Sequence, residues 1–280
     1  MTMVGRLYVV SLPIGNLGDI TLRALETLRS VDFVVAEDTR TTRRVLDHYE
    51  IRTPFRSSFY QGVEDERADE LVGLLRDGKN LALVSDAGTP LVSDPGFPLV
   101  RAAVEAGVAV EPVPGATAVL AGLIASGLPA DRFCFDGALP RKKSHRAEFF
   151  TGLTDEPRTT VVYESPHRLL ETLEILADLL PERRIVLARE LTKLHEEFLR
   201  GTAAEILHAL QARGEVRGEF VLVIAGSESR DGDLDEESAQ SILSVLEAEG
   251  LSKAAVQRIL QVVGGVPRNR AYSLAHRSSG

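Results

Sequence analysis

The sequence predicts an α/β protein made of two successive α/β domains. Short apolar runs alternate with helical patterns, and this alternation repeats about four times before residue 127. Such alternation is typical of a parallel sheet with helices on its faces. Loops of Gly, Pro and small polar residues follow the strands of the first half. Because the carboxyl ends of parallel strands meet at one edge of a sheet, these loops predict a ligand pocket there.

Residues 81–98, LALVSDAGTPLVSDPGFP, are the stretch around which this pocket is organised. The apolar run at residues 81–84 predicts a buried strand, and a loop of small residues follows it at 85–90. Asp94 then predicts the N-cap of a helix, with Pro95 at the first helical position. A strand, a small-residue loop and a helix start form a place where backbone atoms line a ligand.

The first domain, residues 1–127, follows the same plan throughout. Its other strands are expected at residues 6–11, 32–36 and 108–113. Helices are expected at residues 21–30, 41–49, 66–77 and 118–126, with Thr21 as the N-cap of the first. The candidate pocket loops are residues 13–19, 37–40, 85–92 and 114–118.

The second domain, residues 128–228, also alternates strands and helices. Strands are expected at residues 133–137, 159–163, 184–188 and 220–225. One helix is expected after residues 164–168, running through residue 180, and another over residues 203–213. Residues 227–237 are acidic and polar, which is typical of a flexible linker. The tail after it carries two helical patterns, so residues 229–280 are expected to form a linker and a small helical appendix.

Composition limits the class of protein. The net charge of −9 and the pI near 5.3 argue against indiscriminate nucleic-acid binding, although a local basic patch stays open. The single cysteine, Cys134, excludes a disulfide framework and suits a reducing cytoplasm. No apolar run approaches the roughly 18 residues of a membrane helix. We therefore expect a soluble cytoplasmic protein that does not bind a membrane.

Residues 139–146, LPRKKSHR, are the only concentrated cationic segment in the chain. Runs of charged residues commonly form a solvent-exposed face without a specific function, and we give this interpretation the same weight as a functional one. The functional reading is a surface for a polyanion, where each Lys or Arg displaces a counterion.

Several chemistries are excluded by missing motifs. The six histidines lie in different predicted elements, so we expect no metal site. The first loop fits neither the dinucleotide nor the P-loop glycine pattern, and no nucleophile elbow is present. What remains is a cleft lined by backbone and small residues, which suits a cofactor that brings its own reactivity.

Seven strings then carry a resemblance to a known family. SLPIGNLGD, AEDTRTTRRVL, LVSDAGTPLVSDPG, PGATA, GALPRKKSHR, VVYESPHRL and ARELTKLHEE occur in this order within residues 6–226. Together they resemble the tetrapyrrole methylase superfamily, and within it the bacterial 16S ribosomal RNA (cytidine-2′-O)-methyltransferases. The resemblance implies two α/β domains with S-adenosyl-L-methionine in the cleft between them, and a homodimer. It also implies a substrate cytidine in the decoding region of 16S rRNA, presented as naked RNA or in the 30S ribosomal subunit.

The resemblance implies a set of cofactor contacts at the ends of the strands. These are Pro13, Gly88, Thr89, Pro90, Leu91, Val92, Thr117, Ala118, Tyr163, Glu164, Glu219 and Phe220. Thr89 stands where tetrapyrrole methylases carry an aspartate, which puts a carboxylate contact at that position in question.

A ribose hydroxyl is a poor nucleophile, so a base that takes its proton should help by about 10²–10⁴-fold. Candidates at the cleft are Glu37, Asp38, Asp86, Glu164, His167, Glu190 and Lys193. Asp86 is the preferred proton acceptor, and Asp38 and Lys193 are the other catalytic candidates. Either Glu164 or Glu190 could instead form a buried ion pair with Arg168.

Contacts to RNA phosphates are expected from arginines and lysines, because Arg in particular binds phosphate through forked hydrogen bonds. The candidates are Arg40, Arg141, Lys142, Lys143, Arg146 and Arg168.

Two other functions stay open. One is methylation of a tetrapyrrole, against which the AEDTR and YESPHR strings and the basic segment argue. The other is a non-catalytic RNA-binding factor of ribosome assembly, which calorimetry of cofactor binding would separate. A nucleotide-dependent dehydrogenase is disfavoured by the missing glycine fingerprint.

Overall fold

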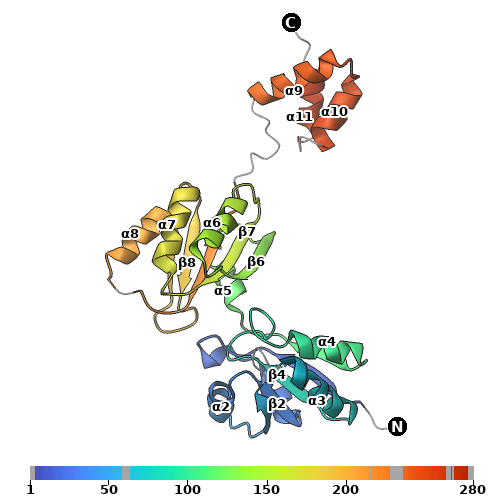
Figure 1. Cartoon of the computed structure of the whole chain (residues 1–280), viewed down its shortest axis with the longest axis vertical. Coiled ribbons are helices and arrows are strands. Elements are labelled where there is room, and N and C mark those ends of the chain that lie inside the picture. Colours follow the sequence, from blue (N-terminus) through green and yellow to red (C-terminus); the bar gives the residue numbers. More distant parts are fainter. Residues whose placement is uncertain are drawn as a thin grey trace. The chain divides into compact units, whose positions relative to one another are not determined.

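Two five-stranded sheets and three C-terminal helices are the main features of the part that the computed structural model describes, residues 4–58, 64–214, 216–227, 236–262, 266 and 268–276 (Figure 1). Both sheets fall within one compact unit, Met1–Thr151 with Arg158–Ala225. A second unit consists of Gly152–Pro157 and Gly226–Gly280. The domain boundaries expected at residues 127 and 228 stay a prediction.

The first sheet is parallel throughout, with the strand order β3-β2-β4-β1-β5. Its strands are β1 (Arg6–Val10), β2 (Phe33–Ala36), β3 (Phe55–Ser58), β4 (Leu81–Val84) and β5 (Ala109–Val113). The central strand β4 is buried at every position, as expected of a strand covered on both faces. The predicted parallel sheet is confirmed. β3 was not predicted, because an edge strand of sequence FRSS has no apolar run.

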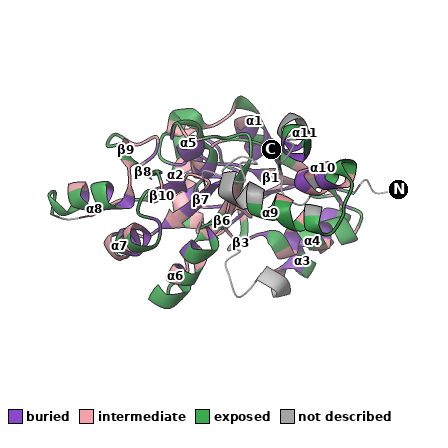
Figure 2. Cartoon of the chain, turned by 90° about the horizontal axis from the view of Figure 1, so that it is seen from above, coloured by how far each residue is buried: buried purple, intermediate pink, exposed green. Residues whose placement is uncertain are grey.

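Helices cover both faces of this sheet. On one face lie α1 (Leu22–Ser30) and α2 (Thr39–His48), which bury Leu28 and Leu46 against the strands. On the other face lie α3 (Glu64–Arg76) and α4 (Phe97–Glu105), which bury Leu71 and Leu99. Figure 2 shows buried residues along the strands and exposed residues on the outer sides of the helices.

Capping was predicted correctly for α1 and wrongly for α4. The Thr21 hydroxyl accepts the N–H of Ala24 at 3.1 Å and caps α1 as expected. The N-cap of α4 is Gly96, not Asp94. The φ angles of Leu91, Ser93 and Gly96 are 72°, 66° and 133°, so the chain loops before the helix starts. Asp94 therefore lies in the loop and not at the helix terminus.

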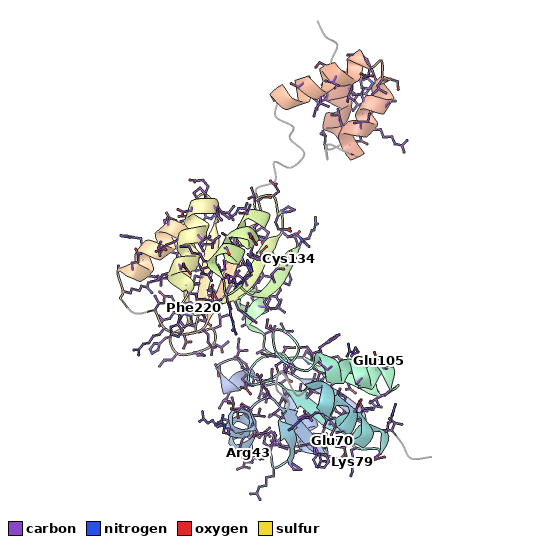
Figure 3. The ribbon with its side chains drawn as sticks, in the orientation of Figure 1. Arg43, Glu70, Lys79, Glu105, Cys134 and Phe220 are labelled. Carbon is purple, nitrogen blue, oxygen red and sulfur yellow. The ribbon has the colours of Figure 1, made fainter. Side chains whose placement is uncertain are left out.

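The second sheet is mixed, with the order β6-β7-β10-β8-β9. Its strands are β6 (Phe133–Ala138), β7 (Thr159–Glu164), β8 (Ile185–Arg189), β9 (Glu197–Gly201) and β10 (Phe220–Ile224). β6 and β7 are parallel, whereas β10 runs antiparallel to both β7 and β8, and β9 antiparallel to β8. In Figure 3, Cys134 of β6 and Phe220 of β10 mark two strands of this sheet.

Helix α5 (Ala118–Ile124) follows β5 and packs against β10 of the second sheet. Val119 and Leu123 of α5 join a core cluster with Val161, Val221 and other apolar residues. The remaining helices of the second half are α6 (Lys143–Gly152), α7 (Leu169–Leu179) and α8 (Ala203–Gln211). A short 3₁₀ helix, η1 (Leu17–Asp19), lies in the first loop.

The C-terminal unit contains α9 (Glu236–Ala248), α10 (Lys253–Val262) and α11 (Arg268–His276). Val256, Leu260, Ala271 and Leu274 form a small core of their own, consistent with a helical appendix. The sequence pattern predicted two helices here, and the structure has three among the residues it describes. In the described part of the chain, no helix has the length and apolar character needed to cross a membrane.

Candidate active site

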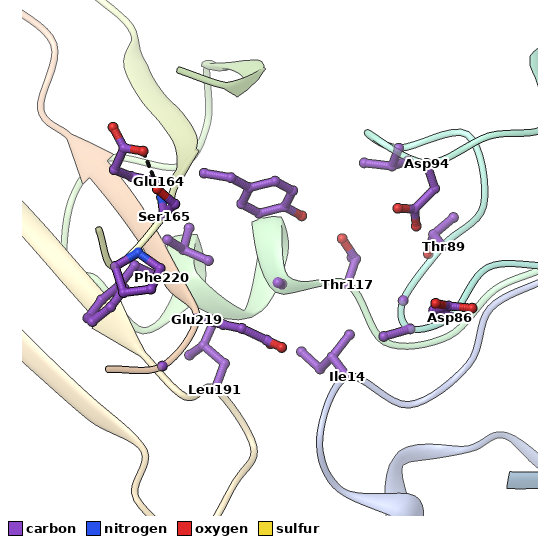
Figure 4. A pocket seen from close by; sticks show the side chains of 18 residues that line it. Ile14, Asp86, Thr89, Asp94, Thr117, Glu164, Ser165, Leu191, Glu219 and Phe220 are labelled. Carbon is purple, nitrogen blue, oxygen red and sulfur yellow. Dashed lines mark hydrogen bonds between the residues drawn. The ribbon is translucent and has the colours of Figure 1, made fainter. Parts of the chain in front are cut away.

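A pocket of about 390 Å³ lies where the strand ends of the first sheet meet loops of the second (Figure 4). The first half of the chain contributes Ile14, Asp86, Ala87, Gly88, Thr89, Val92, Asp94, Thr117 and Ala118. The second half contributes Tyr163, Glu164, Ser165, Pro166, Leu191, Gly218, Glu219, Phe220 and Val221. The pocket therefore forms at the predicted edge of the parallel sheet.

Backbone atoms around Gly88 build one wall of the pocket. The N–H of Leu12 donates to the Gly88 carbonyl at 2.8 Å, and the N–H of Gly88 donates to the Leu12 carbonyl at 3.1 Å. Gly88 has a φ of +72°, and a Cβ there would lie 3.3 Å from the Cγ2 atom of Ile14. A left-handed backbone beside a close neighbour favours glycine.

Thr89 stands where an aspartate was expected from the family pattern. Its side chain forms hydrogen bonds with residues that follow strands of the first sheet. Its hydroxyl lies 2.8 Å from the Ser11 hydroxyl and 3.3 Å from the Ala116 carbonyl oxygen. The side chain thus joins the ends of β1 and β5 and supplies no charge.

Two carboxylates, Asp86 and Asp94, lie on the first-sheet side of the pocket with Thr89 between them in Figure 4. Asp86 Oδ1 accepts the N–H of Asp38 at 3.0 Å. Burial raises the pKa of Asp94, the negative charge of Asp86 adds to the rise, and a hydrogen bond from Ser85 opposes it.

Tyr163, at the end of β7, is the aromatic residue of the opposite wall. Its ring packs edge-on against Phe135, with 5.1 Å between the ring centroids. Burial, and then the charge of Asp94, raises the pKa of Tyr163 to about 12. The phenol is therefore neutral at physiological pH and can donate one hydrogen bond.

The Glu164 carboxylate is buried, and both of its oxygens have partners within the protein. It accepts hydrogen bonds from the Thr172 hydroxyl at 2.7 Å and the Ser165 N–H at 2.6 Å, and it pairs with Arg168 at 2.7 Å. The ion pair of Glu164 with Arg168, one of the two expected from the sequence, is confirmed. These bonds shape the loop that carries Ser165 and Pro166 into the pocket wall.

Lys193 bridges two glutamates beside the pocket. Its ammonium lies 3.0 Å from Glu190 Oε1 and 3.1 Å from Glu219 Oε2. Glu190 also accepts the N–H of Glu219 at 2.9 Å, and this backbone hydrogen bond is the main cause of its lowered pKa. Lys193 thus fixes the Glu219 loop against the residues after β8.

The sequence model of the tetrapyrrole (corrin/porphyrin) methylase family matches residues 6–207 of the chain. The chain belongs to the tetrapyrrole methylase family. This confirms the family that the sequence strings indicated.

Relatives and solved structures agree with this membership. The chain is 47% identical to ribosomal RNA small subunit methyltransferase I of Synechocystis sp. over 274 residues, which cover 97% of this chain and 98% of that protein. It is 43% identical to the protein of the same name from Escherichia coli O157:H7, covering 99% and 96%. A structure of uroporphyrin-III C-methyltransferase from Thermus thermophilus, complexed with S-adenosyl homocysteine, has a TM-score of 0.54 at 22% identity and covers 79% of this chain and 97% of that chain. The structural likeness concerns the fold.

Most of the positions that the methylase resemblance marked for the cofactor line the pocket. They are Gly88, Thr89, Val92, Thr117, Ala118, Tyr163, Glu164, Glu219 and Phe220. Pro13, Pro90 and Leu91 are not among the lining residues. The sequence analysis did not assign Ile14, Leu191 and Asp94 to the cofactor. Ile14 lies within the predicted pocket loop 13–19, Leu191 follows the candidate base Glu190, and Asp94 had been assigned to a helix cap.

The three catalytic candidates differ in their position relative to the pocket. Asp86 lines the pocket, whereas Asp38 and Lys193 do not. Asp38 caps α2 and accepts two hydrogen bonds from the Arg40 side chain, at 3.1 and 2.7 Å. Asp38 therefore has a structural function at the start of a helix.

The cationic residues differ in their exposure. Arg141, Lys142 and Lys143 are exposed before and at the start of α6, and the Arg40 side chain is 87% exposed. Arg146 is only 1% exposed, and its guanidinium donates to the carbonyls of Pro140 and Arg141 and pairs with Glu171. The expectation that Arg146 contacts RNA is therefore wrong, because helix α6 turns this side chain inward.

Arg168 is partly buried and paired with Glu164, and it also donates to the carbonyls of Leu139 and Pro140 at 3.3 and 3.2 Å. It thus holds the loop that bears Arg141 in place. In the described part of the chain, no group of three His, Cys, Asp or Glu side chains is placed to hold a metal ion.

Proposed function

We propose that the protein transfers the methyl group of S-adenosyl-L-methionine to the 2′-hydroxyl of a cytidine in the decoding region of 16S rRNA. The observation that carries this proposal is the charge of the pocket. Asp86, Asp94 and Glu219 line it, and the lining contains no Lys or Arg among the residues that the structure gives. Such a pocket suits a cationic ligand and disfavours phosphates, which bind to arginine, lysine or helix N-termini.

The residues present fit S-adenosylmethionine, which brings an activated methyl group on a positively charged sulfur. The cavity has the size usual for a small-molecule site, and Ile14, Leu191 and Phe220 give it apolar surface for a flat base. Gly88 lines the pocket without a side chain, so a ligand could approach its backbone closely. Thr117 and Ala118 would hold the cofactor from the start of α5.

The RNA substrate is supported by two independent observations. Full-length relatives above 40% identity carry the name ribosomal RNA small subunit methyltransferase I. Arg141, Lys142 and Lys143 form an exposed cationic group despite the net charge of −9. A 2′-hydroxyl acceptor also fits RNA and not DNA. We infer that this group contacts phosphates of 16S rRNA or of the 30S subunit, in the cytoplasm.

A homodimer is inferred as well. Phe97 and Val104, seven residues apart on α4, are large apolar side chains that are 60% and 61% exposed. Residues at this spacing share one face of a helix, and a second copy would remove their apolar surface from water. Light scattering at several concentrations tests this, since a monomer at all concentrations would contradict it.

The proposed function is tested by incubating the protein with labelled S-adenosylmethionine and unmodified small ribosomal subunits, and separately with naked 16S rRNA. We expect label on the ribose of one cytidine in the decoding region. Mass spectrometry of nuclease fragments gives both the nucleotide and the position of the methyl group. Label on a base, or transfer only to a tetrapyrrole, would contradict the proposal. Cofactor binding without any transfer would favour a non-catalytic assembly factor.

A further inference from the structure

Asp94 lies in the pocket wall although its sequence context predicted a helix cap. Granting the proposed function, on which this inference rests, we propose that Asp94 is the general base that takes the proton of the attacking ribose hydroxyl. In this step the ribose oxygen forms a bond to the methyl carbon while the carbon–sulfur bond breaks. The electron pair of that bond goes to sulfur, which becomes neutral, and the hydroxyl proton goes to the Asp94 carboxylate.

The backbone conformation of the loop that carries Asp94 places this side chain at the pocket. Leu91 and Ser93 adopt φ angles of 72° and 66°, a region that residues other than glycine seldom occupy. Gly96 has a φ of 133°, and a Cβ there would lie 2.9 Å from Leu83 Cδ2 of the central strand. Strained backbone of this kind persists where the surroundings determine it, and it concentrates at active sites. Here the consequence is a carboxylate on the pocket wall.

Asp94 is better suited to take a proton than Asp86. One oxygen of Asp86 accepts the N–H of Asp38 at 3.0 Å, and this bond joins the loops after β2 and β4. This oxygen is already engaged by the protein itself as a hydrogen-bond acceptor. Asp86 therefore acts as a fixed charge that connects two loops.

Ser85 allows Asp94 to exist in both protonation states. The Ser85 side chain is buried and donates a hydrogen bond to the Ala87 carbonyl oxygen at 3.0 Å, and its hydroxyl acts to lower the pKa of Asp94. A hydroxyl has one proton to donate. It can donate to the ionised carboxylate, or it can donate to Ala87 and accept from the protonated acid.

The surroundings also adjust the basicity of Asp94. Burial raises its pKa, and the charge of Asp86 adds to this rise. The other titratable group that interacts with it is Tyr163 of β7, whose own pKa of about 12 keeps it neutral. A base is more effective as its pKa approaches the working pH, so the direction of this shift favours catalysis by Asp94.

The test compares Asp94→Asn with Asp131→Asn, a control that removes the same charge from an exposed loop position outside the pocket lining. With labelled S-adenosylmethionine and unmodified small subunits, Asp94→Asn should lower kcat by about 10²–10⁴-fold. Asp94→Glu should recover part of the loss. Cofactor affinity, measured by calorimetry, should fall by about tenfold at most, because the amide keeps the shape of the pocket but removes one of the charges that face the cationic ligand. The loss of kcat is measured at saturating cofactor, so the two effects are separated.

A pH profile separates a base from a structural residue. Since the Ser85 hydrogen bond lowers the pKa of Asp94, Ser85→Ala should move the acidic limb of kcat/KM to higher pH. Asp94→Asn should abolish that limb. Wild-type turnover in Asp94→Asn, or an acidic limb that persists in it, would overturn the role of Asp94. A wild-type protein that binds the cofactor but methylates no RNA would overturn the proposed function, and this role with it.

Discussion

Arg168 Nη2 lies 2.7 Å from Oε1 of Glu164, a side chain with no exposed surface. The same carboxylate binds the hydroxyl of Thr172 in α7 and the N–H of Ser165. Ser165 and Pro166 line the pocket, so the buried ion pair holds one of its walls. A buried charge is tolerated only when its partners are complete, which links the stability of the fold to the shape of the site.

Replacing Arg168 with Met should lower the free energy of unfolding by about 3 kcal/mol, because it leaves the Glu164 carboxylate buried without its counter-ion. Urea denaturation measures the change. The double variant Glu164→Gln with Arg168→Met should be less destabilised than the single variant, since no unpaired charge remains. A loss below about 1 kcal/mol in Arg168→Met would mean that the pair behaves as an exposed one.

Gly88→Ala should weaken cofactor binding by about tenfold, or ~1.4 kcal/mol, because the added methyl group meets Ile14 at the pocket wall. Gly107→Ala is the matched control, since Gly107 has a φ of +70° but no atom within 4 Å of an added Cβ. Both variants should lose about 1 kcal/mol of stability from the left-handed backbone. Calorimetry with S-adenosylmethionine checks the difference, and equal affinities in the two variants would contradict it.

Stability at acidic pH should depend on Asp38. Hydrogen bonds from the Arg40 side chain, and then from its N–H, lower the pKa of Asp38 from 3.8 to about 2. A carboxyl group with a depressed pKa contributes stability above its unfolded value of about 3.9, and this contribution disappears as the pH falls toward the folded value. Thermal midpoints between pH 5 and pH 2 should therefore fall more steeply in the wild type than in Asp38→Asn. Parallel curves would show that the cap at α2 does not contribute.

Replacing Arg141, Lys142 and Lys143 together with Ala should weaken RNA binding and flatten its salt dependence. Each phosphate contact contributes about 0.7–0.9 to the slope of log K against log salt, so three contacts should reduce it by about 2. Filter binding at several salt concentrations measures this slope.

The control for this variant is the simultaneous replacement of Arg52, Arg76 and Arg132 with Ala. It removes the same charge from three other exposed positions, and Arg132 precedes β6 whereas Arg141 follows it. The control should leave the slope unchanged. An equal loss in both variants would assign the effect to total charge and remove the segment from the interface.

Local features of the sequence determined much of the fold. The apolar run Leu81–Val84 is the central strand, with the bounds that the pattern predicted. Thr21 caps α1 because its hydroxyl reaches an N–H three residues away, which is a property of the local chain. Three of the four predicted strand-end loops line one pocket, because parallel strands bring their carboxyl ends together. The fourth, residues 37–40, reaches it only through the hydrogen bond from the N–H of Asp38 to Asp86. The edge strands β3 and β9 escaped prediction, since their sequences, FRSS and EFLRG, contain no run of apolar residues long enough to indicate a strand.

Tertiary structure decided the features that depend on distant partners. The sequence showed Arg146 within a cationic run, but the fold buried it against Glu171, which lies 25 residues away. The sequence pattern predicted Asp94 as a helix cap. In the structure α4 begins after Gly96, which packs closely against Leu83 of the central strand, and Asp94 lies in the pocket wall. The antiparallel direction of β10 likewise follows from pairing with β7 and β8. The sequence alone therefore determined most of the strands, helices and loops, because these depend largely on neighbouring residues. The direction in which charged side chains point was decided by packing between segments far apart in the chain.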